Sequence, residues 1–149
     1  MKKISILYVC ALSLLLFQTS CNKDDEAPAP NPMIGEWELY RLNVDFPGTS
    51  QSDGDYPANS FFNLYKITFN ADDSFVEEVS AGGPISNNEG EWTLTNKEVT
   101  LNYDSGGDDE TFTLNTENTL MTGETFNVNF GTEAAPNVGA VKFIFKKNQ

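Results

Sequence analysis

Short runs in which apolar and polar residues alternate occupy most of this chain after residue 33, and Gly, Asn, Asp and Ser separate them. A period of two places successive side chains on opposite faces of an extended strand. No stretch keeps a helical period for longer than about two turns. The alternation therefore predicts an all-β domain.

The pattern predicts eight strands, at residues 35–44, 63–70, 74–80, 91–95, 98–103, 111–116, 120–130 (in one or two pieces) and 139–147. Short turn signals such as Asn96-Lys97 lie between most neighbours. Tight turns join adjacent antiparallel strands. The exception is residues 45–62, which are rich in Gly, Ser, Asp and Pro and which we expect to form a lid or binding loop.

Each predicted strand has one apolar face; Val99 and Leu101, for example, alternate with Thr100 and Asn102. Eight such strands bury that face by closing into a barrel or by folding over as a sandwich, and hairpin connections favour the barrel. We therefore predict an eight-stranded antiparallel up-and-down β-barrel. The interior of such a barrel is filled by its own side chains or holds one small ligand.

Composition argues against several classes of function. The chain has no histidine, and its two cysteines are Cys10 and Cys21, so His or Cys metal sites and His-based catalysis are not expected. Removing residues 1–20 takes away two of nine basic and none of 22 acidic residues, which leaves a net charge of −15 and makes nucleic acid an unexpected partner. The acidic segments 53–55 and 104–110 fit solvated turns better than calcium sites. We expect no cofactor, no metal and no enzymatic activity.

The first 21 residues have the layout of a signal peptide, with Lys2 and Lys3 before an apolar run at 4–17. That run is shorter than the roughly 20 residues that a spanning helix needs. Thr19 and Ser20 before Cys21 resemble a bacterial lipobox, although Gln18 stands where that pattern prefers Leu. The resemblance implies that Cys21 takes a diacylglycerol and becomes the N-terminus; the alternative is an ordinary cysteine near a conventional cleavage site.

The charged stretch after Cys21 resembles the acidic export signal that sends Bacteroidetes-type lipoproteins to the outer face of the outer membrane. Its charged residues are Lys23, Asp24, Asp25 and Glu26, and the alternative is a merely solvated charge run. Alternating prolines then form an extended spacer, so that residues 21–32 reach roughly 37 Å. We expect a signal at 1–20, a linker at 21–32 and a barrel at 33–149, displayed on the cell exterior.

Two copies of a Gly-Glu-Trp phrase, at Gly35 to Trp37 and at Gly90 to Trp92, open predicted strands. With the segments YKITFNADDSFVEE and GEWTLTNKEVTLNY, their order resembles the small lipocalin-like domains of Bacteroidetes lipoproteins, from residue 33 to about residue 114. The resemblance implies that these glycines and tryptophans build the barrel base, where Trp37 closes the narrow end. A lipocalin usually has an Arg on its last strand over that Trp and a helix after that strand, whereas this strand offers Lys142, Lys146 and Lys147, and we expect no helix after it.

A small hydrophobic molecule is the expected ligand, at the mouth opposite Trp37. The predicted lining comprises Tyr65, Ile67, Phe69, Phe75 and Glu77, and the predicted cover comprises Phe46, Tyr56, Phe61 and Phe62. Glu77 points inward by alternation, so it would bind a polar ligand group or lie at the rim or in a local bulge. The alternative is a side-chain-filled barrel that acts as a protein-binding or structural module.

Replacing Cys21 by Ser is expected to release the protein from membranes, because two acyl chains anchor firmly at ~0.8 kcal/mol per buried CH2. Detergent phase partitioning of wild type and variant measures this. A variant that still fractionates with membranes would contradict lipidation. Protease shaving of intact cells, with Asp24, Asp25 and Glu26 changed to Ala as a control, tests display on the exterior.

Overall fold

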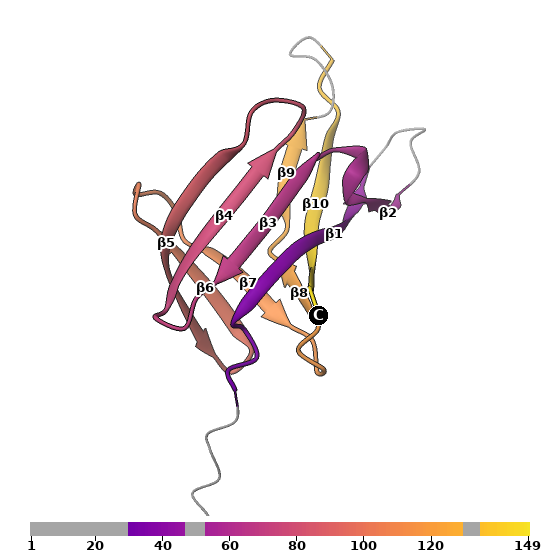
Figure 1. Ribbon diagram of the computed structural model, residues 1–149. Helices are drawn as coiled ribbons and strands as arrows, with labels where there is room; N and C mark the ends of the chain where they lie inside the picture. The colour runs from indigo at the N-terminus through magenta and orange to yellow at the C-terminus, as the bar shows by residue number, and fades with distance from the viewer. Residues whose placement is uncertain (1–29, 47–52, 130–134) are drawn as a thin grey trace, which may run out of the picture. The chain divides into compact units, whose positions relative to one another are not determined.

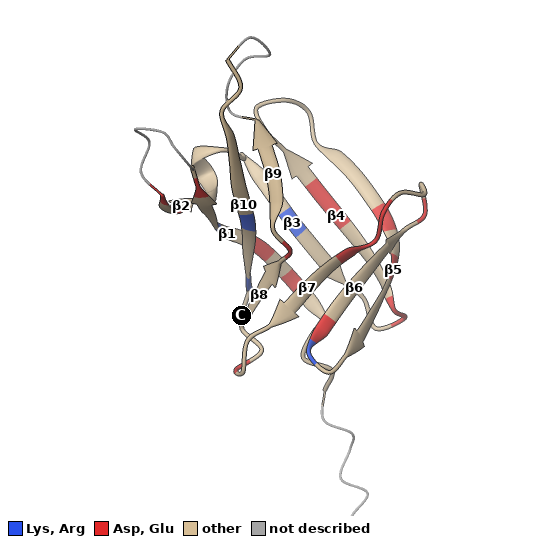
Figure 2. Cartoon of the chain, turned by 180° about the vertical axis from the view of Figure 1, so that it is seen from behind, with Lys and Arg blue, Asp and Glu red and all other residues tan. Residues whose placement is uncertain are grey.

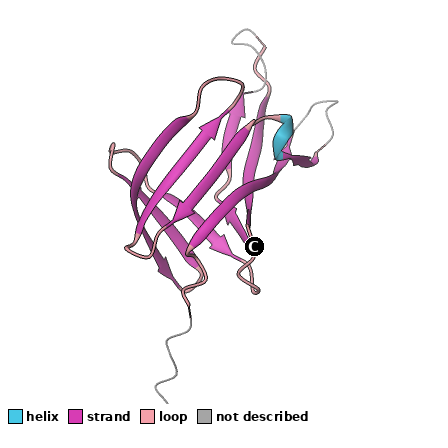
Figure 3. Ribbon diagram, in the orientation of Figure 1, coloured by secondary structure: helices cyan, strands magenta, loops and turns pink. Residues whose placement is uncertain are grey.

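A computed structural model describes residues 30–46, 53–129 and 135–149. The strands are β1 (Gly35–Asp45), β2 (Gly54–Pro57), β3 (Leu64–Phe69), β4 (Ser74–Ser80), β5 (Ser86–Thr95), β6 (Glu98–Tyr103), β7 (Glu110–Leu114), β8 (Leu120–Gly123), β9 (Phe126–Asn129) and β10 (Val138–Lys147). A single 3-10 turn, η1 (Ala58–Ser60), follows β2 (Figure 3). Among the described residues, no helix is long and apolar enough to cross a membrane.

The strands close on themselves. They pair in the order β1-β3-β4-β5-β6-β7-β8-β10, and β10 pairs back onto β1 (Figure 1). All of these pairs are antiparallel, which confirms the predicted eight-stranded up-and-down barrel. Two short strands extend it at one end: β2 pairs with residues 41–44 of β1, and β9 with residues 138–141 of β10.

Most strand boundaries agree with the alternation, and residues 74–80 and 98–103 form strands with the predicted bounds. Two predictions were wrong. The segment 45–62 is not a loop throughout, because it contains β2 and η1. β5 begins at Ser86 rather than at residue 91, because pairing with β4 makes a strand of the polar run Ser86 to Gly90, which has low intrinsic strand propensity.

The base of the barrel is closed around Trp37, which is fully buried. Its indole Nε1 donates to the Met33 carbonyl at 2.8 Å. Lys147 lies opposite Trp37 on β10, with Nζ 5.8 Å from the ring centroid, and it donates to the Pro32 carbonyl. Lys147 is therefore the last-strand cation that covers the first Trp, while Lys142 and Lys146 are exposed.

Side chains fill the barrel at this end. Trp92 is 2% exposed, packs edge-on against Phe69 with ring centroids 5.3 Å apart, and donates to the Asn70 carbonyl at 3.3 Å. The residues with 1% exposure or less include Ile67, Phe69, Phe75, Leu101, Met121 and Phe145. Gly35, Trp37, Gly90 and Trp92, which were predicted to build the barrel base, therefore lie at its packed end.

Close strand packing explains the glycine at position 90. A Cβ there would collide with the Asn102 carbonyl oxygen and lie 2.9 Å from a ring carbon of Phe75. Gly90 pairs with Phe75 on one side and Tyr103 on the other. The missing side chain thus lets a phenylalanine ring lie directly over the strand.

Gly90→Ala is expected to lower the free energy of unfolding by about 1 to 3 kcal/mol, the usual cost of overpacking. Urea unfolding measures the change. Gly83→Ala is the matched control, because a Cβ at Gly83 has no neighbour within 4 Å, and we expect an effect within about 0.5 kcal/mol. Equal effects of the two substitutions would refute the packing explanation.

Candidate functional site

The mouth of the barrel lies at the end opposite Trp37. β4 and β6 end there, and β3, β5 and β7 begin there, since neighbours are antiparallel (Figure 1). The wall also changes partners at this end. β1 pairs with β3 up to Glu38 and with β2 at residues 41–44. β10 pairs with β8 at residues 144–146 and with β9 at residues 138–141.

A wide, open cavity of about 520 Å³ lies at this end. Its lining comes from β3 to β7, β10 and the connecting segments, and comprises Phe62, Tyr65, Glu77, Val79, Ser86, Asn88, Tyr103, Ser105, Gly106, Glu110 and Phe143. Pockets that bind small molecules combine an apolar wall with a few convergent polar groups. This cavity has both.

Phe143 is the centre of the apolar wall. Its ring centroid lies 5.8 Å from Phe62, 5.4 Å from Tyr65 and 4.8 Å from Phe126, all in tilted or edge-on arrangements. Phe62 also packs on Tyr65 at 5.3 Å. The cluster joins the segment after η1 to β3, β9 and β10. Because aromatic pairs of this kind add about 0.5 to 1.5 kcal/mol beyond area burial, the wall has a defined shape.

Glu77 forms the floor of the polar side. It is 3% exposed, and Asn88, opposite it on β5, donates from Nδ2 to Oε2 at 2.7 Å. The expected inward carboxylate is therefore present, in a regular strand rather than a bulge.

Two tyrosines and a second carboxylate complete the polar side. Burial, and then the charges of Glu77 and Glu110, raise the pKa of both Tyr65 and Tyr103, so both phenols stay neutral. Desolvation, and then the charge of Glu77, raise the pKa of Glu110. Hydrogen bonding to Glu110 and Glu77 also raises the pKa of Tyr103, although no partner of its hydroxyl in the described part of the chain meets strict hydrogen-bond geometry.

The structure places the predicted ligand residues in three groups, of which the third, Ile67, Phe69 and Phe75, is described in the next paragraph. In the first group, Phe62, Tyr65 and Glu77 line the mouth cavity. Phe46 is buried and forms a separate edge-on aromatic chain with Tyr56 (6.2 Å), which in turn contacts Phe61 (6.1 Å). This chain does not line the cavity.

The prediction that Ile67, Phe69 and Phe75 line the mouth was wrong. None of the three lines the mouth cavity. Phe69 pairs with Gly35 on one side and Phe75 on the other, at the barrel base, while Ile67 pairs with Trp37 on one side and Glu77 on the other. The alternation correctly placed them on the inner face. It did not show that β3 spans the depth of the barrel and runs from the mouth to the base.

Eight lining residues were absent from the predicted site: Val79, Ser86, Asn88, Tyr103, Ser105, Gly106, Glu110 and Phe143. Inward alternation already marked Tyr103 and Phe143 as interior, and their height in the barrel was the missing information. Asn88 lies in a stretch that was predicted to be a connection, so no signal in the sequence pointed to it.

The remaining sequence predictions fall elsewhere. Asp53 accepts a hydrogen bond from the Phe46 amide at 2.7 Å, and Asp55 forms an ion pair with Arg41 at 3.0 Å, so this acidic segment has local partners. Cys21 and the export-signal residues Lys23, Asp24, Asp25 and Glu26 lie outside the described residues, and their roles stay predictions.

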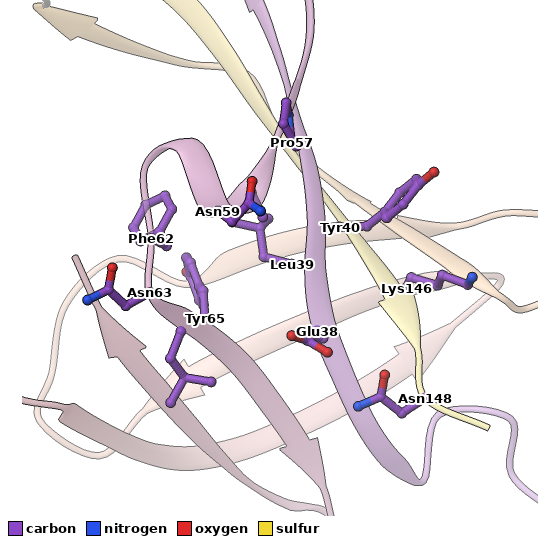
Figure 4. Close-up of a pocket in the computed structure, with 12 residues that line it drawn as sticks. Glu38, Leu39, Tyr40, Pro57, Asn59, Phe62, Asn63, Tyr65, Lys146 and Asn148 are labelled. Atoms are coloured by element: carbon purple, nitrogen blue, oxygen red, sulfur yellow. The ribbon is translucent and has the colours of Figure 1, made fainter. Parts of the chain in front are cut away.

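A second cavity, of about 320 Å³, lies where β1 and β3 separate (Figure 4). A register shift between Leu39 and Arg41 leaves Tyr40 unpaired with β10. Figure 4 shows its mixed lining, which includes Glu38, Tyr40, Asn59, Asn63, Lys146 and Asn148. Phe62 and Tyr65 line both this second cavity and the mouth cavity, so their two rings lie between the cavities.

Comparisons with known proteins address the fold. A crystal structure of a lipocalin-like protein from Bacteroides uniformis is similar at a TM-score of 0.46 and 16% sequence identity, covering 79% of this chain and 100% of that chain. No curated protein matches the sequence. Residues 33–129 match the family described as the lipocalin-like domain. The chain therefore belongs to the lipocalin-like domain family.

Proposed function

We propose that this protein is a non-enzymatic surface lipoprotein whose barrel mouth binds a small hydrophobic molecule. The cavity of about 520 Å³ carries this proposal, because Phe62, Tyr65 and Phe143 give it a continuous aromatic wall. Its volume lies within the roughly 300 to 1,000 Å³ typical of ligand pockets.

Packing of the barrel base supports a ligand position near the mouth. The base is occupied by large side chains such as Trp37, Phe69 and Phe75, which are 1% exposed or less. A bound molecule would therefore rest above this layer, against Val79 and the aromatic wall. Its apolar part would gain about 25 cal/mol for each Å² removed from water.

The anchor and display are part of the same proposal and rest on the sequence. A lipid at Cys21 and an extended linker of roughly 37 Å would hold the barrel clear of the lipid surface. The acidic cluster after Cys21 supports export to the cell exterior. A surface position would bring the open cavity into contact with molecules from outside the cell.

A protein-binding or structural module is the second candidate. The filled barrel base favours it, because a packed interior leaves the fold to serve as a scaffold. Exposed apolar residues near the mouth add support, namely Phe61, Ile85, Phe126 and Val138, with exposures of 38 to 57%. Both candidates use the same fold.

An uncharged naphthylamine dye is expected to gain fluorescence on titration into the unlipidated mature chain (residues 21–149 with Cys21→Ser). Phe62→Ala should weaken this binding by about tenfold, since it removes one wall of the cavity and roughly 1.4 kcal/mol is a factor of ten. Phe61→Ala is the matched control, because its ring contacts Tyr56 and lies outside the lining.

The alternative candidate predicts a different result. If the barrel is a filled scaffold, the wild-type chain would not bind the dye, and Phe62→Ala would create binding by opening a cavity. Binding that both alanine variants leave unchanged would place the dye elsewhere and would remove the mouth from the proposal. Native mass spectrometry of the purified chain would detect any apolar molecule that co-purifies and would give its mass.

A further inference from the structure

Positive charge is absent from the lining of the mouth cavity. The described residues include six basic side chains, Arg41, Lys66, Lys97, Lys142, Lys146 and Lys147, and none of the six lines it. Arg41 pairs with Asp55, and Lys66 with Glu36 and Glu78. Figure 2 shows the acidic residues of β4, of the start of β7 and of the β6–β7 connection near this end. The cavity is therefore strongly negative.

Three of the four remaining basic residues also lie away from the cavity. Lys97 donates to the Asn115 and Thr116 carbonyls at the base, and Lys147 covers Trp37. Lys146 lies over the exposed Tyr40 ring on the outside of the barrel. In the part of the chain that the structure describes, no ion pair reaches Glu77 or Glu110.

Glu77 is buried without a charged partner. A carboxylate that is 3% exposed has lost most of its hydration, and its hydrogen-bonding neighbours, the Asn88 amide and the Tyr65 and Tyr103 hydroxyls, are all neutral. Glu110 adds a second carboxylate to the same lining, and it raises the electrostatic cost because like charges repel. A cation bound between the two would supply the compensating charge.

The neighbouring groups suit a positively charged nitrogen. Tyr65, Tyr103, Phe62 and Phe143 present aromatic rings to the cavity, and aromatic faces attract ammonium groups. The Tyr103 hydroxyl stands on the acidic side of the cavity and interacts with the carboxylates of Glu110 and Glu77. These features converge on one end of the cavity, while the apolar wall continues along Phe143 toward Phe126.

We infer that the ligand is a cationic amphiphile, with an ammonium head between Glu77 and Glu110 and an apolar body along Phe62 and Phe143. The inference rests on the proposed function, because it names the ligand class of the same cavity. Fatty acids and other anionic amphiphiles are disfavoured, since their carboxylate would face two carboxylates with no cation between them. Desolvation and the charge of Glu77 raise the pKa of Glu110, while its hydrogen bond with Tyr103 lowers it, which agrees with a shortage of positive charge in the lining.

Three amphiphiles of equal chain length test the inference: octylammonium, octanol and octanoate. Each is titrated against the unlipidated mature chain with the uncharged naphthylamine dye bound, and displacement is measured at low salt. We expect octylammonium to bind about tenfold more tightly than octanol, the effect of one partly desolvated charge pair, and octanoate to bind most weakly. Added salt should weaken octylammonium binding and leave octanol unchanged.

Glu77→Gln and Glu110→Gln assign the preference to the cavity. Both variants keep the shape of the side chain, and Gln at position 77 still accepts from Asn88 through its Oε1. Each should reduce the octylammonium preference over octanol several-fold while octanol binding stays constant. Glu89→Gln is the control, because Glu89 is exposed, follows Asn88 on β5 and does not line the cavity.

The outcomes separate the two proposals. The cationic ligand is refuted, and hydrophobic binding stands, if octanol and the dye bind but octylammonium binds no more tightly than octanol. The same holds if both Gln variants keep the full preference for octylammonium. If neither the dye nor any amphiphile binds, both proposals fall. Thermal unfolding monitors the fold of each variant, and should Glu77→Gln fail to fold, Glu110→Gln at the exposed start of β7 decides alone.

Discussion

The pairing of β1 with β10 is the interaction on which the rest of the structure depends. It joins the first and last long strands, closes the barrel and leaves no free edge in the eight-stranded ring. Its register also places Lys147 opposite Trp37, so that the cation covers the indole that plugs the base. Because β1 and β10 extend beyond the ring, the same pairing carries β2 and β9 and shapes the mouth.

The two ends of the barrel differ in how their interiors are filled. At the base, Trp37, Phe69 and Phe75 are packed without exposure, and apolar burial supplies the main stabilisation. At the mouth, Glu77 and Asn88 interrupt the apolar interior with a carboxylate and its hydrogen-bond donor. A buried carboxylate contributes little to stability on its own, which is why this end, rather than the base, is the candidate site.

Alternation in the sequence was enough to predict the inner face of each strand. Tyr65, Ile67 and Phe69 all point inward as expected, and so do Glu77 and Phe143, because a strand has no other way to separate its two faces. Alternation did not predict how far each residue lies from the base of the barrel. Ile67 lies beside Trp37 while Tyr65 reaches the mouth, and only the direction and register of β3 distinguish them.

The sequence by itself determined the all-β class, the number of strands in the ring and the acidic, histidine-free character of the chain, since these depend on local period and composition. Tertiary structure alone decided that Asn88 joins a strand and donates to Glu77, that Lys147 rather than Lys142 or Lys146 covers Trp37, and that two carboxylates share one cavity. Each of these is a contact between strands. Register sets such contacts, and register depends on how all the strands close together.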